Sequence, residues 1–297
     1  MLYFLALASA ALYGAADFLG GLASRRASTV AVVIVSQLAG LLLLAAMMPF
    51  LPDAQPSTRD LWWGMAAGVS GGVGVGLLYR ALAVGTMALV APTTAVCAVV
   101  IPVLAAVALG ERPSMRVVAS IVLALVAIVL VSQSSSGTPG TPGTLGTPGT
   151  LGAPGTLGTP GTLTPGLGLA LGSGVAIGLF FLSLARTGSD AGMWPLMSAR
   201  AIAVAMFSGL ALVTGRRVRL PRPAAPLAIV GGAMDMLANA LYVVASRSGP
   251  LSVVVTLASL YPASTVILAR VVLGERLTAW QGAGIACALV AVVLIVG

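Results

Sequence analysis

The chain has 297 residues, of which 59% are hydrophobic and only 7% are charged, and its mean hydropathy is +1.08. A soluble domain carries roughly a quarter charged residues, so this composition excludes a water-soluble globular protein. The formal charge of +8 would suggest a nucleic-acid partner in a soluble protein, but all the cations are arginines and most lie in short loops beside apolar segments. We assign them to membrane topology and expect no nucleic-acid partner.

The apolar residues form ten blocks near twenty residues long, the length at which a helix crosses roughly 30 Å of hydrocarbon. Because helices satisfy their own backbone polar groups in lipid, the sequence predicts an all-α integral membrane protein with ten transmembrane helices. The expected spans are residues 2–22, 30–50, 61–79, 88–109, 115–132, 166–185, 193–214, 226–245, 251–273 and 279–296.

The first span carries a tyrosine and a carboxylate on one face. No positive charge precedes the apolar run, which favours a retained span over a cleavable secretion signal. Asp17 follows Tyr13 by four residues, so both side chains share a helix face. Both are candidates for a substrate or coupling-ion site, because an ionisable group in a span usually faces a cavity or a partner. Alternatively, Asp17 lies near enough to the interface to reach water.

The third span has a glycine at every fourth position, which places a stripe of small residues on one face. Small residues let helix backbones approach closely in lipid, so we expect the stripe to pack against another helix. No strand precedes it, which excludes a dinucleotide-binding loop. The stripe consists of Gly64, Gly68, Gly72 and Gly76.

Between the fifth and sixth spans, glycine recurs at every third position from Gly137 to Gly161. Proline occurs in only some of these triplets, and a collagen-like structure would need three chains. We therefore expect a flexible Gly/Thr/Pro linker. It divides the chain into a first five-helix unit (1–133), the linker (134–165) and a second five-helix unit (166–297).

The eighth span carries Asp235 near its centre, with Asn239 and Tyr242 four and seven residues later on the same face. We predict that this face lines the path of a small-molecule substrate and binds the substrate or a coupling ion, with protons as a candidate. Arg200 of the seventh span leaves two alternatives open. It forms an ion pair with Asp235 that locks two helices together, or it attracts an anionic group of the substrate.

The residues needed for common catalytic sites are missing. The chain has no histidine and no lysine, which excludes His-based serine and zinc chemistry and a Ser-Lys dyad. No Walker motif is present. Both cysteines, Cys97 and Cys287, lie inside apolar spans, so a disulfide framework is excluded. We expect no catalytic residue, no metal site and no cofactor.

The two five-helix units are copies of one another. A shift of 164 residues places the Leu-Gly-Glu-Arg motif of 109–112 on that of 273–276, and the match continues into the following spans. Since each copy has an odd number of spans, the second copy enters the membrane in the opposite orientation. We predict two inverted five-helix repeats, an arrangement that lets secondary transporters alternate around one midplane site.

Three features together resemble the EamA-like family of the drug/metabolite transporter (DMT) superfamily: Tyr13-Gly14, the Tyr-Arg-Ala-Leu motif of 79–82, and the paired Leu-Gly-Glu-Arg motifs. The resemblance covers the chain except the linker. It implies ten helices in the plasma membrane, both termini in the cytoplasm, and export of amino acids, related metabolites or toxic compounds, usually without ATP. The first repeat departs from the family pattern at Ala98, where the second repeat has Pro262.

The arginine distribution disagrees with the implied orientation, because positive-inside logic would place both termini outside the cytoplasm. Loops on the side of the termini carry Arg59, Arg112, Arg116, Arg186 and Arg247. The other side carries Arg25, Arg26, Arg80, Arg216, Arg217, Arg219, Arg222 and Arg276.

These features predict a secondary transporter that exports small amphipathic metabolites by alternating access. We expect it to work in the lipid bilayer as a monomer or a homodimer. A non-transporting membrane scaffold or sensor is the alternative, and it would show no substrate-dependent flux. A channel is less favoured, because inverted halves favour alternating access.

Overall fold

The computed structural model describes residues 1–84, 87–131, 166–215, 218–273 and 278–296. The expected linker at 134–165 and most of the second Leu-Gly-Glu-Arg motif lie outside the described residues. Within the described ranges all regular structure is helical and no strand occurs.

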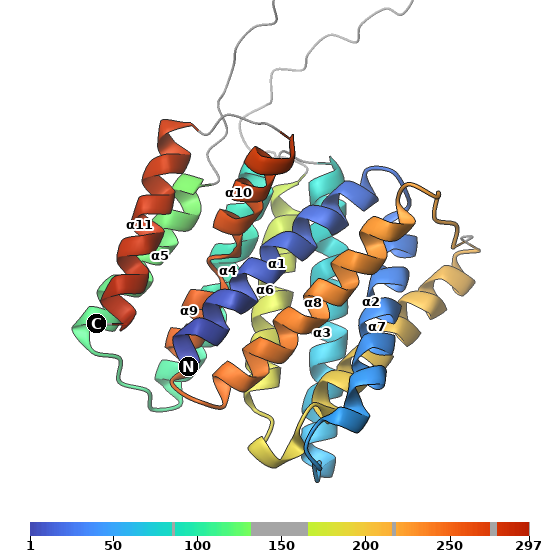
Figure 1. The fold of residues 1–297 in the computed structure, drawn as a ribbon, viewed down its shortest axis with the longest axis horizontal. Coiled ribbons are helices and arrows are strands. Elements are labelled where there is room, and N and C mark those ends of the chain that lie inside the picture. The colour runs from blue at the N-terminus through green and yellow to red at the C-terminus, as the bar shows by residue number, and fades with distance from the viewer. Residues whose placement is uncertain (85–86, 132–165, 216–217, 274–277, 297) are drawn as a thin grey trace, which may run out of the picture.

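The helices pack into one bundle (Figure 1). The first unit contains α1 (Leu2–Ser24), α2 (Thr29–Met47), the 3-10 turn η1 (Met48–Phe50), α3 (Thr58–Val84), α4 (Met87–Ala108) and α5 (Met115–Val131). The second unit contains α6 (Leu167–Ala185), the 3-10 turn η2 (Ser189–Ala191), α7 (Trp194–Val213), α8 (Ala225–Ser246), α9 (Leu251–Ala258), α10 (Tyr261–Leu273) and α11 (Ala279–Val296).

The lengths and the outer surface of the helices fit a multi-pass membrane protein. Among the described residues, six helices are long and apolar enough to cross a membrane: α1, α2 extended through η1, α3, α6, α7 and α8. Shorter apolar helical segments cover Thr93–Ala108, Met115–Leu130, Leu251–Thr265 and Ala279–Ile295. Large apolar side chains such as Leu104, Leu212 and Val293 are exposed on the outside. Lipid, rather than water, stabilises so apolar a surface.

One expected helix is interrupted. Residues 251–273 were predicted as one span, but they form α9 and α10, which are separated at Ser259 and Leu260. Pro262 explains the break, because proline has no N–H and its ring clashes with the carbonyl four residues earlier. That carbonyl belongs to Ala258, the last residue of α9. The corresponding helix α4 has Ala98 at the position of Pro262 and is continuous.

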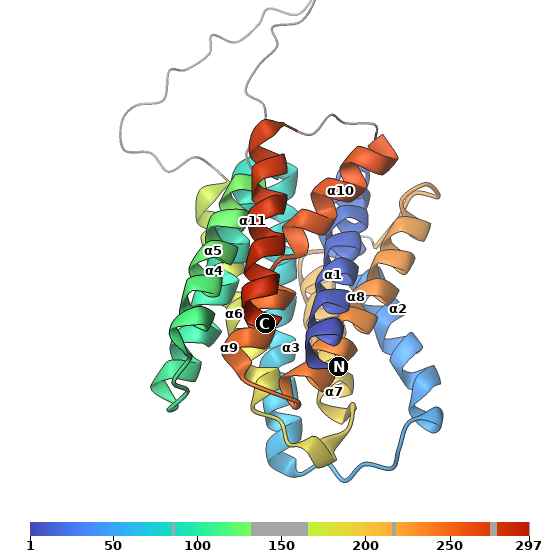
Figure 2. The same ribbon diagram turned by 60° about the vertical axis from the view of Figure 1, so that its left-hand side comes forward.

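The main packing contacts join helices from the two units. The helix α1 packs along α8, and α3 packs along α6; α2 contacts α8, and α3 contacts α7. The helices α5 and α11 pair with each other, at one edge of the bundle in Figure 1 and side by side in Figure 2. In Figure 1, α1 rises from the N-terminus while α6 descends. The shift of 164 residues relates α1 to α6, α2 to α7 and α3 to α8. The α1–α8 pairing therefore corresponds to α6–α3, and the α2–α8 pairing corresponds to α7–α3.

The glycine stripe of α3 faces α7. A Cβ at Gly64 would lie 2.4 Å from the carbonyl oxygen of Pro195, and a Cβ at Gly68 would lie 2.4 Å from that of Ala199. The missing side chains therefore let the two backbones approach closely. The other members of the stripe, Gly72 and Gly76, meet side chains of α7 instead, namely Met206 and Phe207.

Polar contacts join the two units at the end of the bundle where α1 begins. The N–H of Gly188, after α6, donates to Oδ1 of Asp60 at 2.7 Å. The carboxylate of Glu111, after α4, accepts from the N–H groups of Leu251 at 2.8 Å and Ser252 at 3.3 Å. Glu111 thus satisfies free donors in the first turn of α9, where a negative charge is also favoured by the helix dipole.

Candidate functional site

A cavity of about 60 Å³ lies inside the bundle between helices of both units. The helices α1, α2 and α3 line it from the first unit, and α6, α7, α8 and α10 line it from the second. Five of the six residues that the sequence singled out for a substrate or coupling ion are in its lining: Tyr13, Asp17, Arg200, Asp235 and Asn239.

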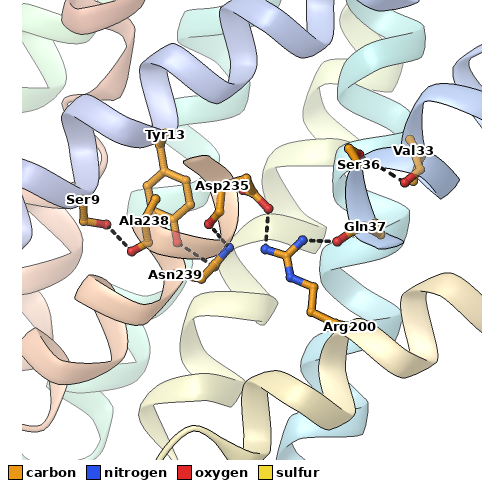
Figure 3. A network of polar contacts seen from close by, with 9 residues as sticks. All are labelled: Ser9, Tyr13, Val33, Ser36, Gln37, Arg200, Asp235, Ala238 and Asn239. Atoms are coloured by element: carbon orange, nitrogen blue, oxygen red, sulfur yellow. Dashed lines mark hydrogen bonds and ion pairs between the residues drawn. The ribbon is translucent and has the colours of Figure 1, made fainter. Parts of the chain in front are cut away.

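Arg200 of α7 is the centre of a polar network (Figure 3). Its Nη2 forms an ion pair with Oδ2 of Asp235 on α8, and its Nη1 donates to the amide oxygen of Gln37 on α2. The side chain of Arg200 is 7% exposed and that of Asp235 is 24% exposed. The network connects three helices, and Arg200 compensates the charge of Asp235 inside the bundle.

A second set of contacts fixes α1 against α8. The hydroxyl of Tyr13 donates to Oδ1 of Asn239 at 2.7 Å, and Nδ2 of Asn239 donates to the carbonyl oxygen of Asp235 at 2.6 Å. Nearby, the hydroxyl of Ser9 donates to the carbonyl oxygen of Ala238 at 2.8 Å. Because both ends of the Asn239 amide are engaged, this side chain is held in one orientation.

Asp17 differs from Asp235 in its polar contacts. Within the described part of the chain its carboxylate has neither a hydrogen bond nor an ion pair. It lines the central cavity and also a second cavity of about 50 Å³ between α1, α3 and α10. The two cavities share Asp17, Leu78 and Tyr261. The hydroxyl of Tyr261 is also buried, with no partner among the described residues.

Tyr242, the sixth predicted site residue, lies outside the cavity lining. It is fully buried, and its hydroxyl donates to the carbonyl oxygen of Phe181 at 3.0 Å. The rings of Tyr242 and Phe181 have centroids 4.6 Å apart. Tyr242 therefore packs α8 against α6 through Phe181, and it does not itself line the cavity.

The cavity also contains residues that the sequence did not indicate. Gln37 is the one amide side chain within the second expected span, and this polarity in an apolar block was a usable signal. Tyr261 precedes Pro262, the proline at the break between α9 and α10. Phe180 and Phe181 of α6 gave no signal, because apolar side chains are expected everywhere in such a helix.

Polar and apolar residues line different walls of the cavity. The polar wall comes from α1 and α8, and the apolar wall comes from their counterparts α6 and α3. The polar residues are Tyr13, Asp17, Asp235 and Asn239, and a shift of 164 residues relates them to Ile177, Phe181, Gly71 and Val75. All eight residues line the same cavity. The described residues contain no group of three or more His, Cys, Asp or Glu side chains that could hold a metal ion.

Comparison with known proteins gives the family. The model of the EamA-like transporter family matches residues 1–133 and 164–297. A crystal structure of a protein with 15% sequence identity has a similar fold, with a TM-score of 0.65 over 97% of this chain and 98% of that chain. No curated protein matches the chain. The family match covers most of the chain, and the chain therefore belongs to the EamA-like transporter family of the DMT superfamily.

Proposed function

We propose that this protein is a secondary transporter that exports a small amphipathic metabolite across the plasma membrane by alternating access. The observation that carries the proposal is the cavity between the two units, which is lined by the charged residues Asp17, Arg200 and Asp235. Charged side chains within membrane spans are costly and generally mark a path for a substrate or an ion.

The proposal includes ten spans arranged as two inverted five-helix repeats, with α9 and α10 together forming the ninth span. It is supported by helix pairings that have counterparts in the two units and by the opposite directions of α1 and α6 (Figure 1). Two related halves allow two nearly equivalent packings, one open to each side. Interrupted spans such as α9–α10 are common beside the sites of transporters.

Transport requires the cavity to widen. Its volume of about 60 Å³ is well below the roughly 300 to 1,000 Å³ of sites for drug-sized ligands. The contacts of Asp60 and Glu111 hold loops together at the end where α1 begins, so they must break for an opening there. At the other end, a groove of about 550 Å³ lies between the end of α1, the start of α2, α3 and α7.

Both termini are placed in the cytoplasm in this proposal, as the family resemblance implies. The arginine distribution argues for the opposite orientation. A reporter enzyme fused to either terminus and active only outside the cytoplasm would overturn this placement, without affecting the proposed transport.

The test of transport is an untargeted analysis of metabolites in the growth medium and inside the cells. Cells would express wild type, Asp235→Asn or the matched control Asp53→Asn at equal membrane levels. Asp53 is exposed in the loop between η1 and α3. We expect a compound to accumulate in the medium with wild type and with the control, but not with Asp235→Asn.

Analysis of both compartments also detects import. If the medium and the cell contents were the same with all three proteins and with cells that lack the protein, the transporter proposal would be wrong. The chain would then be better explained as a membrane scaffold or sensor.

A further inference from the structure

The charges that line the central cavity do not balance. Its ionisable lining residues are Asp17, Arg200 and Asp235, apart from the tyrosines. Arg200 and Asp235 form an ion pair, so their charges compensate each other. Asp17 has no such partner among the described residues. When all three groups are ionised, the lining carries one net negative charge, at Asp17.

The surroundings of Asp17 suit a cation with an apolar body. Tyr13 of α1 and Phe181 of α6 form an edge-to-face pair with ring centroids 5.8 Å apart, and Phe180 lies beside Phe181. Aromatic rings attract cations and also bury apolar groups. The hydroxyl oxygen of Tyr261, buried without a partner among the described residues, offers a lone pair to a cationic group at the place where the two cavities meet.

Other charge classes fit this lining less well. The guanidinium of Arg200 already donates to Asp235 and Gln37, so an anion there would compete with Asp235 and would add a negative charge to a lining that already carries an unpaired carboxylate. The carboxylate of a zwitterion meets the same obstacle. A neutral molecule would leave the carboxylate of Asp17 without a counter-charge, so that it would lose its charge only by taking up a proton. A cation would neutralise Asp17 and leave the Arg200–Asp235 pair intact.

We propose that the carboxylate of Asp17 binds the cationic group of the substrate, and that the transported compound is therefore an organic cation with an apolar body. The inference rests on the proposed transport function and names its substrate class. In this assignment Asp235 is a positioning residue: it holds Arg200, and its backbone carbonyl orients Asn239, which in turn accepts the hydrogen bond from Tyr13. The apolar body of the substrate lies against α3 and α6.

The experiment measures ligand binding to the purified full-length protein in lipid nanodiscs. The probe is benzyltrimethylammonium, a permanent cation whose charge does not change with pH. Phenylacetate and phenylalanine carry the same ring with an anionic or a zwitterionic group. The variants are Asp17→Asn, Asp17→Glu and the exposed control Asp53→Asn, each checked for a monodisperse, helical protein.

We expect wild type and Asp53→Asn to bind the cation more tightly than either other probe. Asp17→Asn should bind it at least about tenfold more weakly, because a charge-assisted contact is lost. Asp17→Glu should keep part of the affinity, since it preserves the charge.

Three results would overturn the assignment: no binding of the cation to wild type, equal affinity in Asp17→Asn, or tighter binding of phenylacetate or phenylalanine. The ligand comparison in wild type decides the question even if a variant does not fold. These results concern the substrate class only. The transport function fails separately, through unchanged metabolites in medium and cells.

Discussion

The two walls of the central cavity come from equivalent helices and differ in chemistry. The α1–α8 pair contributes two carboxylates and a hydrogen-bonded tyrosine–asparagine contact, whereas the corresponding α6–α3 pair contributes Phe181, Ile177 and Val75. Both pairs pack closely, although the side chains that they contribute to the cavity differ. Two helix pairs of similar packing can thus form a site with one polar and one apolar wall, which two pairs with identical side chains could not.

The difference between the walls also separates two kinds of contribution. Residues on the polar wall can select the charge of a substrate, and residues on the apolar wall can select its shape and size. Substitutions of lining residues that leave the helix packing unchanged should therefore alter binding without loss of fold. Substitutions at the helix contacts should lower the stability of the fold without altering which ligands bind. The predictions below test this separation.

The largest effect is expected at the ion pair that supports the polar wall. Arg200→Gln would leave Asp235 and Gln37 without their partner inside the bundle. Removing one member of a buried charged pair costs about 3–5 kcal/mol of unfolding free energy. Reversible unfolding of the purified protein in detergent would measure this loss.

The double variant Arg200→Gln with Asp235→Asn tests the origin of that loss. It removes both charges, so it should be more stable than Arg200→Gln alone. Arg59→Gln, at an exposed arginine near the start of α3, is the matched control. A loss in Arg200→Gln no larger than in this control would show that the pair does not support the wall.

A smaller effect is expected at two corresponding glycines, one in a helix of each wall, where helices approach closely. Gly68 on α3 and Gly232 on α8 are equivalent under the shift of 164 residues. A Cβ would lie 2.4 Å from the carbonyl oxygen of Ala199 at the first and 2.1 Å from that of Ser36 at the second. Alanine at either glycine forces two backbones apart, at a cost of about 1–3 kcal/mol.

Gly231→Ala is the control for this pair. At Gly231, beside Gly232, a Cβ would lie 3.3 Å from the nearest atom, the Cβ of Leu19. This contact is only a few tenths of an ångström too close, and alanine has the higher helix propensity, so Gly231→Ala should change the unfolding free energy much less. Equal losses at all three positions would argue that close backbone approach is not what these glycines provide.

The sequence predicted the helical segments well, because an apolar block near twenty residues long has few other solutions in lipid. It predicted residues 251–273 as one helix, since the strong apolar pattern outweighed the single Pro262. The polar residues of the cavity could be picked out because such side chains are rare in membrane spans. Phe180 and Phe181 could not, because their residue type does not distinguish a cavity from lipid or from a helix contact.

Helical periodicity did not predict the position of Tyr242 correctly. Its spacing from Asp235 places both on one face of α8, yet only Asp235 reaches the cavity. A helix that crosses others at an angle presents one face to different neighbours along its length. Seven residues after Asp235, that face of α8 has already left the cavity and meets α6. The partners of a face depend on crossing angles, which a single sequence does not contain.

The smallest effect is therefore expected at Tyr242, which joins α8 of the polar wall to α6 of the apolar wall outside the cavity lining. Tyr242→Phe removes the hydrogen bond to the carbonyl oxygen of Phe181 and keeps the ring packing. It should cost about 1 kcal/mol of unfolding free energy or less. The affinity of this variant for benzyltrimethylammonium should stay that of wild type, because the side chain does not line the cavity.

Tyr13→Phe is the comparison inside the cavity. It also removes one hydroxyl, but this frees the Asn239 amide oxygen to face the ligand, so binding should change. If Tyr242→Phe altered binding more than Tyr13→Phe, packing behind the apolar wall would control the site, and charge and shape could not be assigned to separate walls.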